Sequence, residues 1–186
     1  MRVISGSAAR RKLQSPSGME IRPTPDRIKE TLFNILAPDI FGSDFLDMFS
    51  GTGQIGIEAL SRGAASAVFV DDGKNAIDCI KKNVEVLNGL DMKYDIYRMS
   101  AASAVSKLYT MGKKFDLIFM DPPYNKGLER DVLTAIQSYP VLKEDGRIIV
   151  EASSETEFDY LEGTNMEIVR EKNYGSNKHI FIAYKS

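Results

Sequence analysis

The chain has 186 residues, of which 43% are hydrophobic, and it carries one cysteine, one histidine and a formal net charge of −2. This length and apolar content predict a single domain with one good core. The lone Cys79 excludes an internal disulfide and a cysteine-based metal site, and the solitary His179 leaves no ligand set for zinc, so we expect no metal.

The distribution of charge and hydropathy adds a second set of bounds. No segment reaches the length of about 18 apolar residues that a membrane span requires, and the opening MRVIS is not a signal peptide, so we expect a cytoplasmic protein without a membrane partner. Residues 1–36 hold seven Lys or Arg and three acids, whereas residues 37–186 hold 17 and 23. We predict a basic arm (1–36) joined to an acidic body (37–186), effectively one structural domain.

The arm is predicted to start with a short hairpin. Arg2-Val3-Ile4 would return as Met19-Glu20-Ile21 through a loop rich in Ser, Pro and Gly. A helix is expected from about 26 to 36, with Thr24 as its N-cap and Pro25 at the first helical position. A basic arm suits contacts with phosphates, and a solvated surface hairpin that happens to be basic is the alternative.

From residue 44 onward, apolar runs alternate with stretches of helical period, which predicts βαβ units and a mostly parallel sheet. The expected strands are 44–49, 67–71, 94–98, 115–120 and 146–151, and the expected helices are about 54–62, 74–88, 101–110, 127–138 and 155–162. Two further strands, 166–170 and 180–184, flank a short turn at 173–177 and must therefore run antiparallel. Cys79 is expected in the core, and His179 is expected to be a strand residue.

Residues 45–60, FLDMFSGTGQIGIEAL, place Gly51, Gly53 and Gly56 in a G-x-G-x-x-G spacing between a strand and a helix. Such a turn lets backbone N–H groups approach a ligand closely. Asp71 ends the next apolar run, where an acid can bind ribose hydroxyls. Dinucleotide enzymes and S-adenosylmethionine enzymes share this arrangement, and a plain βα turn can also be rich in glycine. The loop alone does not choose among them.

Residues 115–124, FDLIFMDPPY, predict a buried strand that ends in Asp121-Pro122-Pro123-Tyr124, facing the ligand crevice. The two prolines fix φ and remove two N–H donors, so the rim accepts hydrogen bonds and does not donate them. A planar amino group offers two N–H donors and a face for stacking. These properties match the Asp121 carboxylate, the Pro122 carbonyl and the Tyr124 ring, whereas a dehydrogenase has no use for this set.

The tetrapeptide resembles the D/N-P-P-Y/F/W motif of S-adenosylmethionine enzymes that methylate exocyclic amino groups. A closer resemblance covers nearly the whole chain, through Arg2-Val3-Ile4-Ser5-Gly6, Arg22-Pro23-Thr24-Pro25-Asp26-Arg27, the glycine loop with Gly56-Ile57-Glu58-Ala59-Leu60-Ser61-Arg62-Gly63-Ala64, and Asp121-Pro122-Pro123-Tyr124. This set resembles the bacterial family that methylates the 2-amino group of one guanine in 16S ribosomal RNA.

The resemblance implies an α/β, Rossmann-like methyltransferase fold with a mostly parallel seven-stranded sheet, a C-terminal antiparallel hairpin and a small N-terminal hairpin. It implies S-adenosylmethionine as the methyl donor, S-adenosylhomocysteine as the product, and direct methyl transfer to a flipped base. The implied partner is 16S ribosomal RNA, within a small-subunit assembly particle.

Residue roles also follow from the resemblance. Asp121, Pro122 and Tyr124 are the implied catalytic residues. The implied cofactor contacts are Asp47 on the ammonium, Phe49, Gly51 and Gly53 at the methionine end, Asp71 on the ribose, and Ser100 and Ala101 near the adenine. Ser100 stands where the family often has Asp or Asn, so we expect retained but weaker cofactor binding. The basic residues expected to contact RNA are Arg10, Arg11, Lys12, Arg22, Arg27, Lys126 and Arg130.

Three other hypotheses stay open. A protein glutamine methyltransferase would present the same rim but is expected to carry a peptide-docking extension. A DNA amino methyltransferase would normally add a target-recognition region. A non-catalytic RNA-binding module would explain the basic arm and leave the Asp121 rim unexplained.

Overall fold

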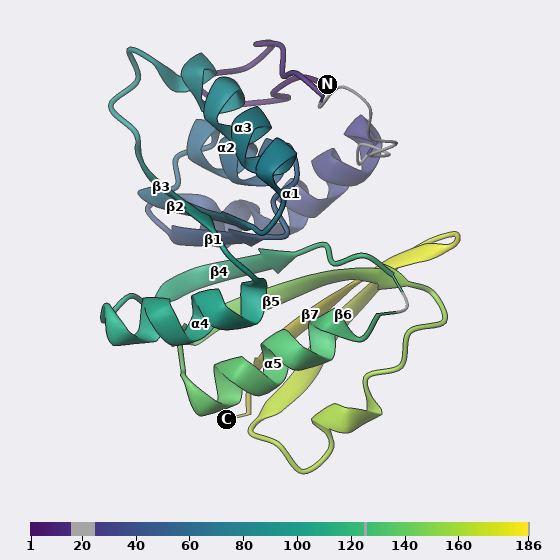
Figure 1. Ribbon diagram of the computed structural model, residues 1–186. Coiled ribbons are helices and arrows are strands. Elements are labelled where there is room, and N and C mark those ends of the chain that lie inside the picture. Colours follow the sequence, from purple (N-terminus) through teal and green to yellow (C-terminus); the bar gives the residue numbers. More distant parts are fainter. Residues whose placement is uncertain (16–24, 125, 186) are drawn as a thin grey trace.

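The computed structural model describes residues 1–15, 25–124 and 126–185. One sheet lies between two layers of helices, with α1, α2 and α3 on one face and α4 and α5 on the other (Figure 1). The strands are β1 (Asp44–Met48), β2 (Ser66–Asp71), β3 (Lys93–Arg98), β4 (Phe115–Met120), β5 (Leu142–Ser153), β6 (Met166–Tyr174) and β7 (Asn177–Tyr184). The helices are α1 (Asp26–Ile40), α2 (Gln54–Ser61), α3 (Lys74–Asn83), α4 (Ala101–Thr110) and α5 (Leu128–Ser138), with short 3₁₀ turns η1 (Val84–Leu87) and η2 (Asp159–Leu161).

The strand order is β3-β2-β1-β4-β5-β7-β6. Strands β1 to β5 pair in parallel, and β7 lies antiparallel between β5 and β6. This topology confirms the predicted seven-stranded, mostly parallel sheet with a C-terminal antiparallel hairpin. The five parallel strands occur close to where they were predicted. Strands β1, β2 and β4 are continuous apolar runs, because strands covered on both faces need apolar side chains in both directions, whereas the edge strand β3 is mostly exposed.

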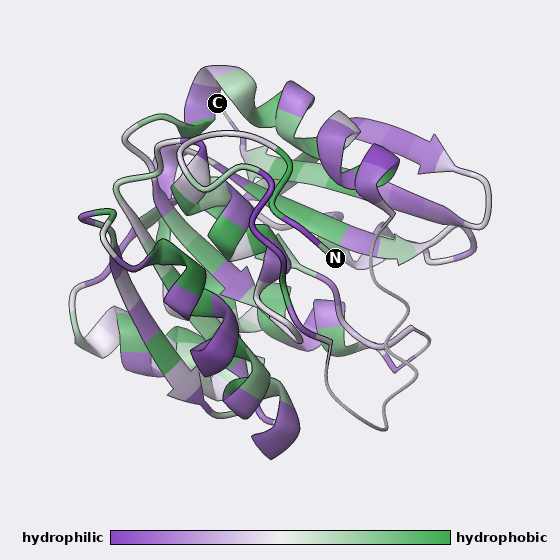
Figure 2. Cartoon of the chain, turned by 90° about the horizontal axis from the view of Figure 1, so that it is seen from above, coloured by the Kyte–Doolittle hydropathy of each residue, from purple (hydrophilic) through white to green (hydrophobic). Residues whose placement is uncertain are grey.

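The two faces of the sheet divide the core. Phe45 and Phe119 point toward α1, α2 and α3, whereas Leu46, Met48 and Ile118 point toward α4 and α5, as the two-residue period of a strand requires. The central strands are mostly hydrophobic, whereas the edge strands β3 and β6 and the outward faces of the helices are largely hydrophilic (Figure 2). No helix in the described part of the chain combines the length and the apolar character that crossing a bilayer demands.

Two predicted helices are wrong in extent. In place of a helix at 155–162 the chain forms only η2. Phe158 and Leu161 are buried in the core and Tyr160 packs against it, and a short helix nucleates poorly. The helix predicted at 74–88 ends as α3 at Asn83 and tightens into η1. The Asn83 side chain is buried there, and its amide donates to the carbonyls of Gln14 and Thr52 at 3.0 and 2.9 Å.

The arm also differs from the prediction. Within the described residues the chain turns back directly after Arg2–Ile4. The Val3 N–H donates to the Arg11 carbonyl, and the Arg10 N–H donates to the Val3 carbonyl. The predicted partner at 19–21 lies outside the described residues, as does Thr24. Pro25 is the N-cap of α1 rather than its first helical residue, and the helix runs on past the predicted end to Ile40, with Pro38 inside it.

A buried carboxylate fastens the arm to the body. The two oxygens of Glu58, on α2, accept hydrogen bonds from the backbone N–H groups of Ile4 and Ser5 at 2.8 and 3.0 Å. Arg62 pairs with the same carboxylate at 2.8 Å, and Lys29 lies 3.8 Å from it. Glu58 and Lys29 are fully buried. Burial lowers the pKa of Lys29, and Glu58 acts in the opposite direction by favouring its charged form.

Candidate functional site

A cavity of about 630 Å³ opens at the carboxyl ends of the central parallel strands. Strands β1 and β4 are neighbours there, and the chain leads away from them in opposite directions, which is where open α/β sheets bind ligands. The start of α1 and the tip of the β6–β7 hairpin lie at the same edge (Figure 1). The predicted site residues in its wall are Asp47, Phe49, Gly51, Asp71, Asp121, Pro122 and Tyr124. The glycine loop and the proline-rich rim therefore share one cavity.

Asp71 joins two loops of this cavity. One carboxylate oxygen accepts from the Gly51 N–H and the other from the Gly73 N–H, both at 2.9 Å. These bonds fix the carboxylate at the end of β2 while leaving further lone pairs on both oxygens. Asp71 can thus accept from a ligand hydroxyl without releasing either loop.

The other glycines of the motif serve the packing beneath the loop. Gly53 caps the N-terminus of α2 with φ of +75°, a left-handed conformation that favours glycine. A Cβ on Gly56 would collide with the Phe69 ring, so this position allows α2 to lie close against β2. Phe49 also has positive φ, +57°, which is uncommon for an aromatic residue and places backbone strain in the wall of the cavity.

Asp47 is a buried acid at the end of β1. Its side chain accepts a hydrogen bond from the Gly56 N–H at 2.9 Å. Burial raises the pKa of Asp47 to about 7, with a smaller contribution in the same direction from Asp71, while the Gly56 bond opposes the rise. Among the described residues no cationic side chain pairs with it. A positively charged ligand in the cavity would stabilise the ionised form.

The proline-rich rim lies where the sequence predicted it, directly after β4. The Asp121 N–H reaches the Met48 carbonyl of the neighbouring strand at 3.5 Å. Burial raises the pKa of Asp121 well above its ordinary value, and the nearby carboxylates of Glu151 and Asp47 raise it further. A carboxylate held in this way takes up a proton more readily than one in water.

The Tyr124 phenol is fixed by two partners from distant parts of the chain. Its hydroxyl donates to Glu151 Oε1 at 3.3 Å and accepts from Asn177 Nδ2 at 2.7 Å. Burial, with the negative charge of Glu151, raises the pKa of Tyr124 far above its usual range, so the phenol stays protonated. The side chain is still 40% exposed, which leaves ring surface for contact with a ligand.

Glu151 and Asn177 are residues of the cavity wall that the sequence analysis missed. Glu151 lies near the C-terminal end of β5, two residues before its last residue, and is buried. Its Oε2 lies 3.2 Å from Nε2 of the buried His179 on β7, a strand residue as expected. An acid directly after the apolar run Ile148-Ile149-Val150 could have been singled out, since Asp71 and Asp121 occupy the same position on their strands. The contact of Glu151 with His179, and that of Tyr124 with Asn177, depend on the register of β5 with β7, which no local pattern specifies.

Three predicted cofactor residues are not among the described residues that line the cavity: Gly53, Ser100 and Ala101. The Ser100 hydroxyl caps α4 by accepting from the Ser103 N–H at 3.3 Å. This local bond gives the serine a structural role. Its contact with an adenine stays a prediction.

The predicted RNA contacts are surface residues where they are described. Arg10, Arg11, Lys12, Arg27, Lys126 and Arg130 are exposed, and Arg22 lies outside the described residues. Two of them have local partners, since Arg11 donates to the Val86 carbonyl and the Arg130 guanidinium lies 5.4 Å from the centre of the Tyr160 ring. Arg27 is on the first turn of α1, next to Ile28 in the cavity wall. Its position suits contact with the phosphates of a nucleic acid that reaches the cavity.

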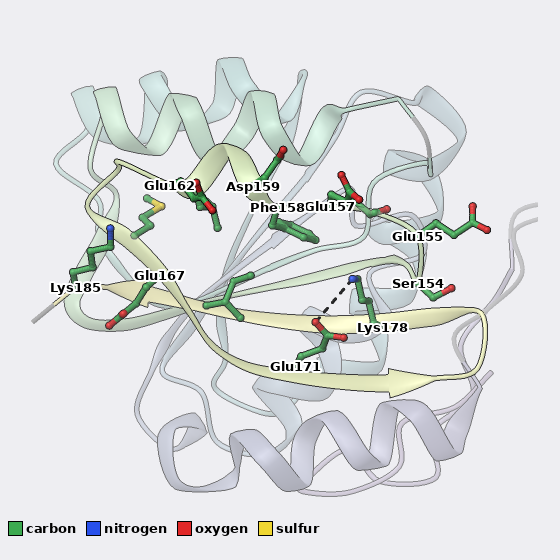
Figure 3. A pocket seen from close by; sticks show the side chains of 14 residues that line it. Ser154, Glu155, Glu157, Phe158, Asp159, Glu162, Glu167, Glu171, Lys178 and Lys185 are labelled. Atoms are coloured by element: carbon green, nitrogen blue, oxygen red, sulfur yellow. Dashed lines mark ion pairs between the residues drawn. The ribbon is translucent and has the colours of Figure 1, made fainter.

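A second hollow lies between the segment after β5 and strands β6 and β7 (Figure 3). Six acids surround it, Glu155, Glu157, Asp159, Glu162, Glu167 and Glu171, with Lys178 and Lys185. It contains no predicted site residue. Its excess of negative charge disfavours phosphates, so this face is unsuited to nucleic acid.

Comparison with known proteins finds relatives along the whole chain. Residues 1–183 match the family described as Conserved hypothetical protein 95. Ribosomal RNA small subunit methyltransferase D of Escherichia coli K12 is 36% identical over 155 residues, covering 83% of this chain and 76% of its own. The Bacillus subtilis protein YlbH is 39% identical over 175 residues, or 94% of each chain. The solved structure of Escherichia coli yhhF matches with a TM-score of 0.83 at 31% identity, covering 100% of this chain and 98% of that one.

Proposed function

We propose, from the premise that this chain belongs to the family described as Conserved hypothetical protein 95, that it methylates the 2-amino group of a guanine in 16S ribosomal RNA, with S-adenosylmethionine as donor. The names of its relatives from Escherichia coli and Haemophilus influenzae, ribosomal RNA small subunit methyltransferase D, support ribosomal RNA as the substrate class. The observation that carries the proposal is the meeting of the Asp121 rim and the glycine loop in one cavity.

The donor set of the cavity fits this cofactor. Asp47 and Asp121 are acids whose pKa values are raised by burial, and neither has a cationic partner among the described residues. A ligand that carries an ammonium and a sulfonium would supply the missing positive charge. Asp47 would hold the ammonium and Asp71 the ribose hydroxyls, with Phe49 and Gly51 beside them.

When bound, S-adenosylmethionine supplies a methyl group on a positively charged sulfur. Asp121 and the Pro122 carbonyl would accept the two N–H groups of the guanine amine, which favours a nitrogen whose lone pair points out of the ring plane. Holding the amine in that orientation can contribute up to about 7–11 kcal/mol of the barrier in favourable cases. Asp121 is then the nearest acceptor for the proton, and its raised pKa suits it to that role.

The target base must leave its RNA stack to enter this cavity, at a cost of a few kcal/mol. The partly exposed Tyr124 ring would offset part of that cost by stacking on the base. The exposed basic residues would hold neighbouring phosphates, with Arg27 near one side of the cavity and Lys126 just past the rim on the other. We place this reaction in the cytoplasm, on a small-subunit assembly particle.

The test is a methyl-transfer assay with labelled S-adenosylmethionine on four substrates. These are 16S ribosomal RNA, assembled small-subunit particles, DNA and a release factor. We expect label on the RNA or the particles, at the exocyclic amine of one guanine when the product nucleosides are identified. Label on the release factor or the DNA, or cofactor-independent RNA binding without label, would instead support one of the three alternatives.

Cofactor binding is expected to depend on pH. Because the pKa of Asp47 is raised to about 7, its carboxyl is protonated in most molecules near pH 6 and ionised in most molecules near pH 7.5. Only the ionised form attracts an ammonium, so calorimetry should show affinity rising several-fold over that interval, with proton release. Asp47→Asn should weaken affinity by roughly 10- to 150-fold, as expected for loss of a charged hydrogen bond of about 1.5–3 kcal/mol, and should flatten the pH profile. A wild-type affinity independent of pH would remove Asp47 from the ammonium site.

Tyr124 is expected to affect base stacking and not cofactor binding. Tyr124→Ala should lower methyl transfer by about 5- to 150-fold, the equivalent of about 1–3 kcal/mol of base stacking, with cofactor affinity nearly unchanged. Tyr124→Phe retains the ring and serves as the control, with a smaller loss. Equal losses of activity and of cofactor affinity in the alanine variant would argue against a stacking role.

A further inference from the structure

Glu151 is a buried carboxylate held from both sides. Its backbone pairs with that of His179 in the antiparallel register of β5 and β7. One oxygen contacts His179 Nε2 at 3.2 Å and the other accepts from the Tyr124 hydroxyl at 3.3 Å. Its side chain is only 7% exposed, and the cavity that holds Asp121 is where it reaches the surface. No Lys or Arg side chain pairs with it in the described part of the chain.

A purely structural role does not account for the charge at this position. A glutamine could accept from Tyr124 and lie beside His179 without repelling Asp121. The carboxylate of Glu151 instead raises the pKa of Asp121, so the two negative charges oppose each other across the cavity wall. Groups kept in such an unfavourable state cluster at functional sites. The charge therefore calls for a positive or hydrogen-donating ligand.

The carboxylate has capacity left for such a ligand. A carboxylate offers about four acceptor positions, and His179 and Tyr124 occupy two of them. Asp121 directly follows β4 and Glu151 lies near the C-terminal end of the neighbouring strand β5, and both line the same cavity, so a flat ligand can meet both. Together they form a wall that accepts hydrogen bonds at two adjacent points.

We propose, resting on the methyl transfer proposed above, that Glu151 is a specificity-determining residue that accepts the ring N1–H of the flipped guanine while Asp121 accepts its 2-amino group. Guanine carries these donors on adjacent atoms. Adenine and cytosine carry their amino group next to a ring nitrogen with a lone pair, which a carboxylate repels. A site built to bind an N–H rejects analogues that lack it, because its own buried acceptor is then left unpaired. His179 is a positioning residue that holds Glu151 against the cavity.

The test compares the target guanine with 2-aminopurine at the same position of the RNA. 2-Aminopurine keeps the 2-amino nucleophile but has a lone pair in place of the N1–H. The wild-type protein should methylate the guanine at least about 100-fold faster. In Glu151→Gln the amide can donate to that lone pair, so the preference for guanine should fall at least tenfold, with cofactor affinity within about twofold of wild type.

Glu155→Gln is the matched control, since Glu155 follows the same strand, is exposed and lies outside this cavity; its preference should equal that of wild type. Equal effects of Glu151→Gln on both substrates would overturn the proposal, and so would a wild-type protein that methylates 2-aminopurine within threefold of guanine. The comparison of guanine with 2-aminopurine in the wild-type protein tests recognition of the N1–H even if the Glu151→Gln variant does not fold. A wild-type protein that methylates no guanine at all would refute the proposed function itself.

Discussion

Replacing Asp121 by alanine is expected to reduce methyl transfer by about 100- to 10,000-fold, the range that loss of a positioned proton acceptor produces. Asp121 is the only described carboxylate on the proline-rich rim, so no neighbour on that rim can both orient the amine and take its proton. Asp121→Asn should also be severely impaired, because an amide cannot accept the proton. Rates under saturating cofactor measure the effect directly.

The fold supplies a control for this result. The pKa of Asp121 is raised in the folded protein, so ionising it costs stability, and that cost grows as pH rises through the interval above its ordinary value. Asp121→Asn removes the cost, and its thermal midpoint near pH 8 should equal or exceed that of wild type. Loss of activity with intact folding and cofactor binding would support the role, whereas full activity would exclude Asp121 from the chemistry.

Glu58→Ala is expected to lower the free energy of unfolding by about 3–5 kcal/mol, as removal of one member of a buried ion pair does. The fully buried Lys29 would lose its partner, and the N–H groups of Ile4 and Ser5 would lose their acceptor. Urea denaturation measures the change. Glu30→Ala, on the exposed side of α1, is the control and should change stability little. A loss below about 1 kcal/mol for Glu58→Ala would mean that the arm is not fastened by this carboxylate.

The sequence predicted those parts of the site that neighbouring residues specify. The glycine loop, Asp71 and the Asp121 rim were found because a ligand-binding turn and the end of a buried strand leave short, local patterns. The central parallel strands β1, β2 and β4 were found from continuous apolar runs for the same reason. The hairpin at the C-terminal end was found from its turn at 173–177, which lies between two β-rich runs.

What the sequence did not predict depends on contacts between distant segments. Glu151, His179 and Asn177 form one cluster with Tyr124 only because β7 is inserted between β5 and β6 in a particular register. Residues 155–162 have a composition that is common in helices, but they form only η2 because Phe158 and Leu161 are buried in the core. Pro25 caps α1 through its carbonyl, which accepts from Ile28 and Lys29, and side-chain patterns do not reveal such a backbone cap.

The place of β7 in the sheet has a consequence for the order in which the protein is made. Asn177 and His179 belong to β7, which follows all the other described strands in the chain, yet β7 lies inside the sheet and supports the rim formed by a tetrapeptide more than fifty positions earlier. The glycine loop can therefore form during synthesis before the partners of Tyr124 and Glu151 on β7 have been made. On the function proposed above, a chain without β7 would keep its glycine loop but would lose the partners that hold Glu151 and Tyr124 beside the proline-rich rim.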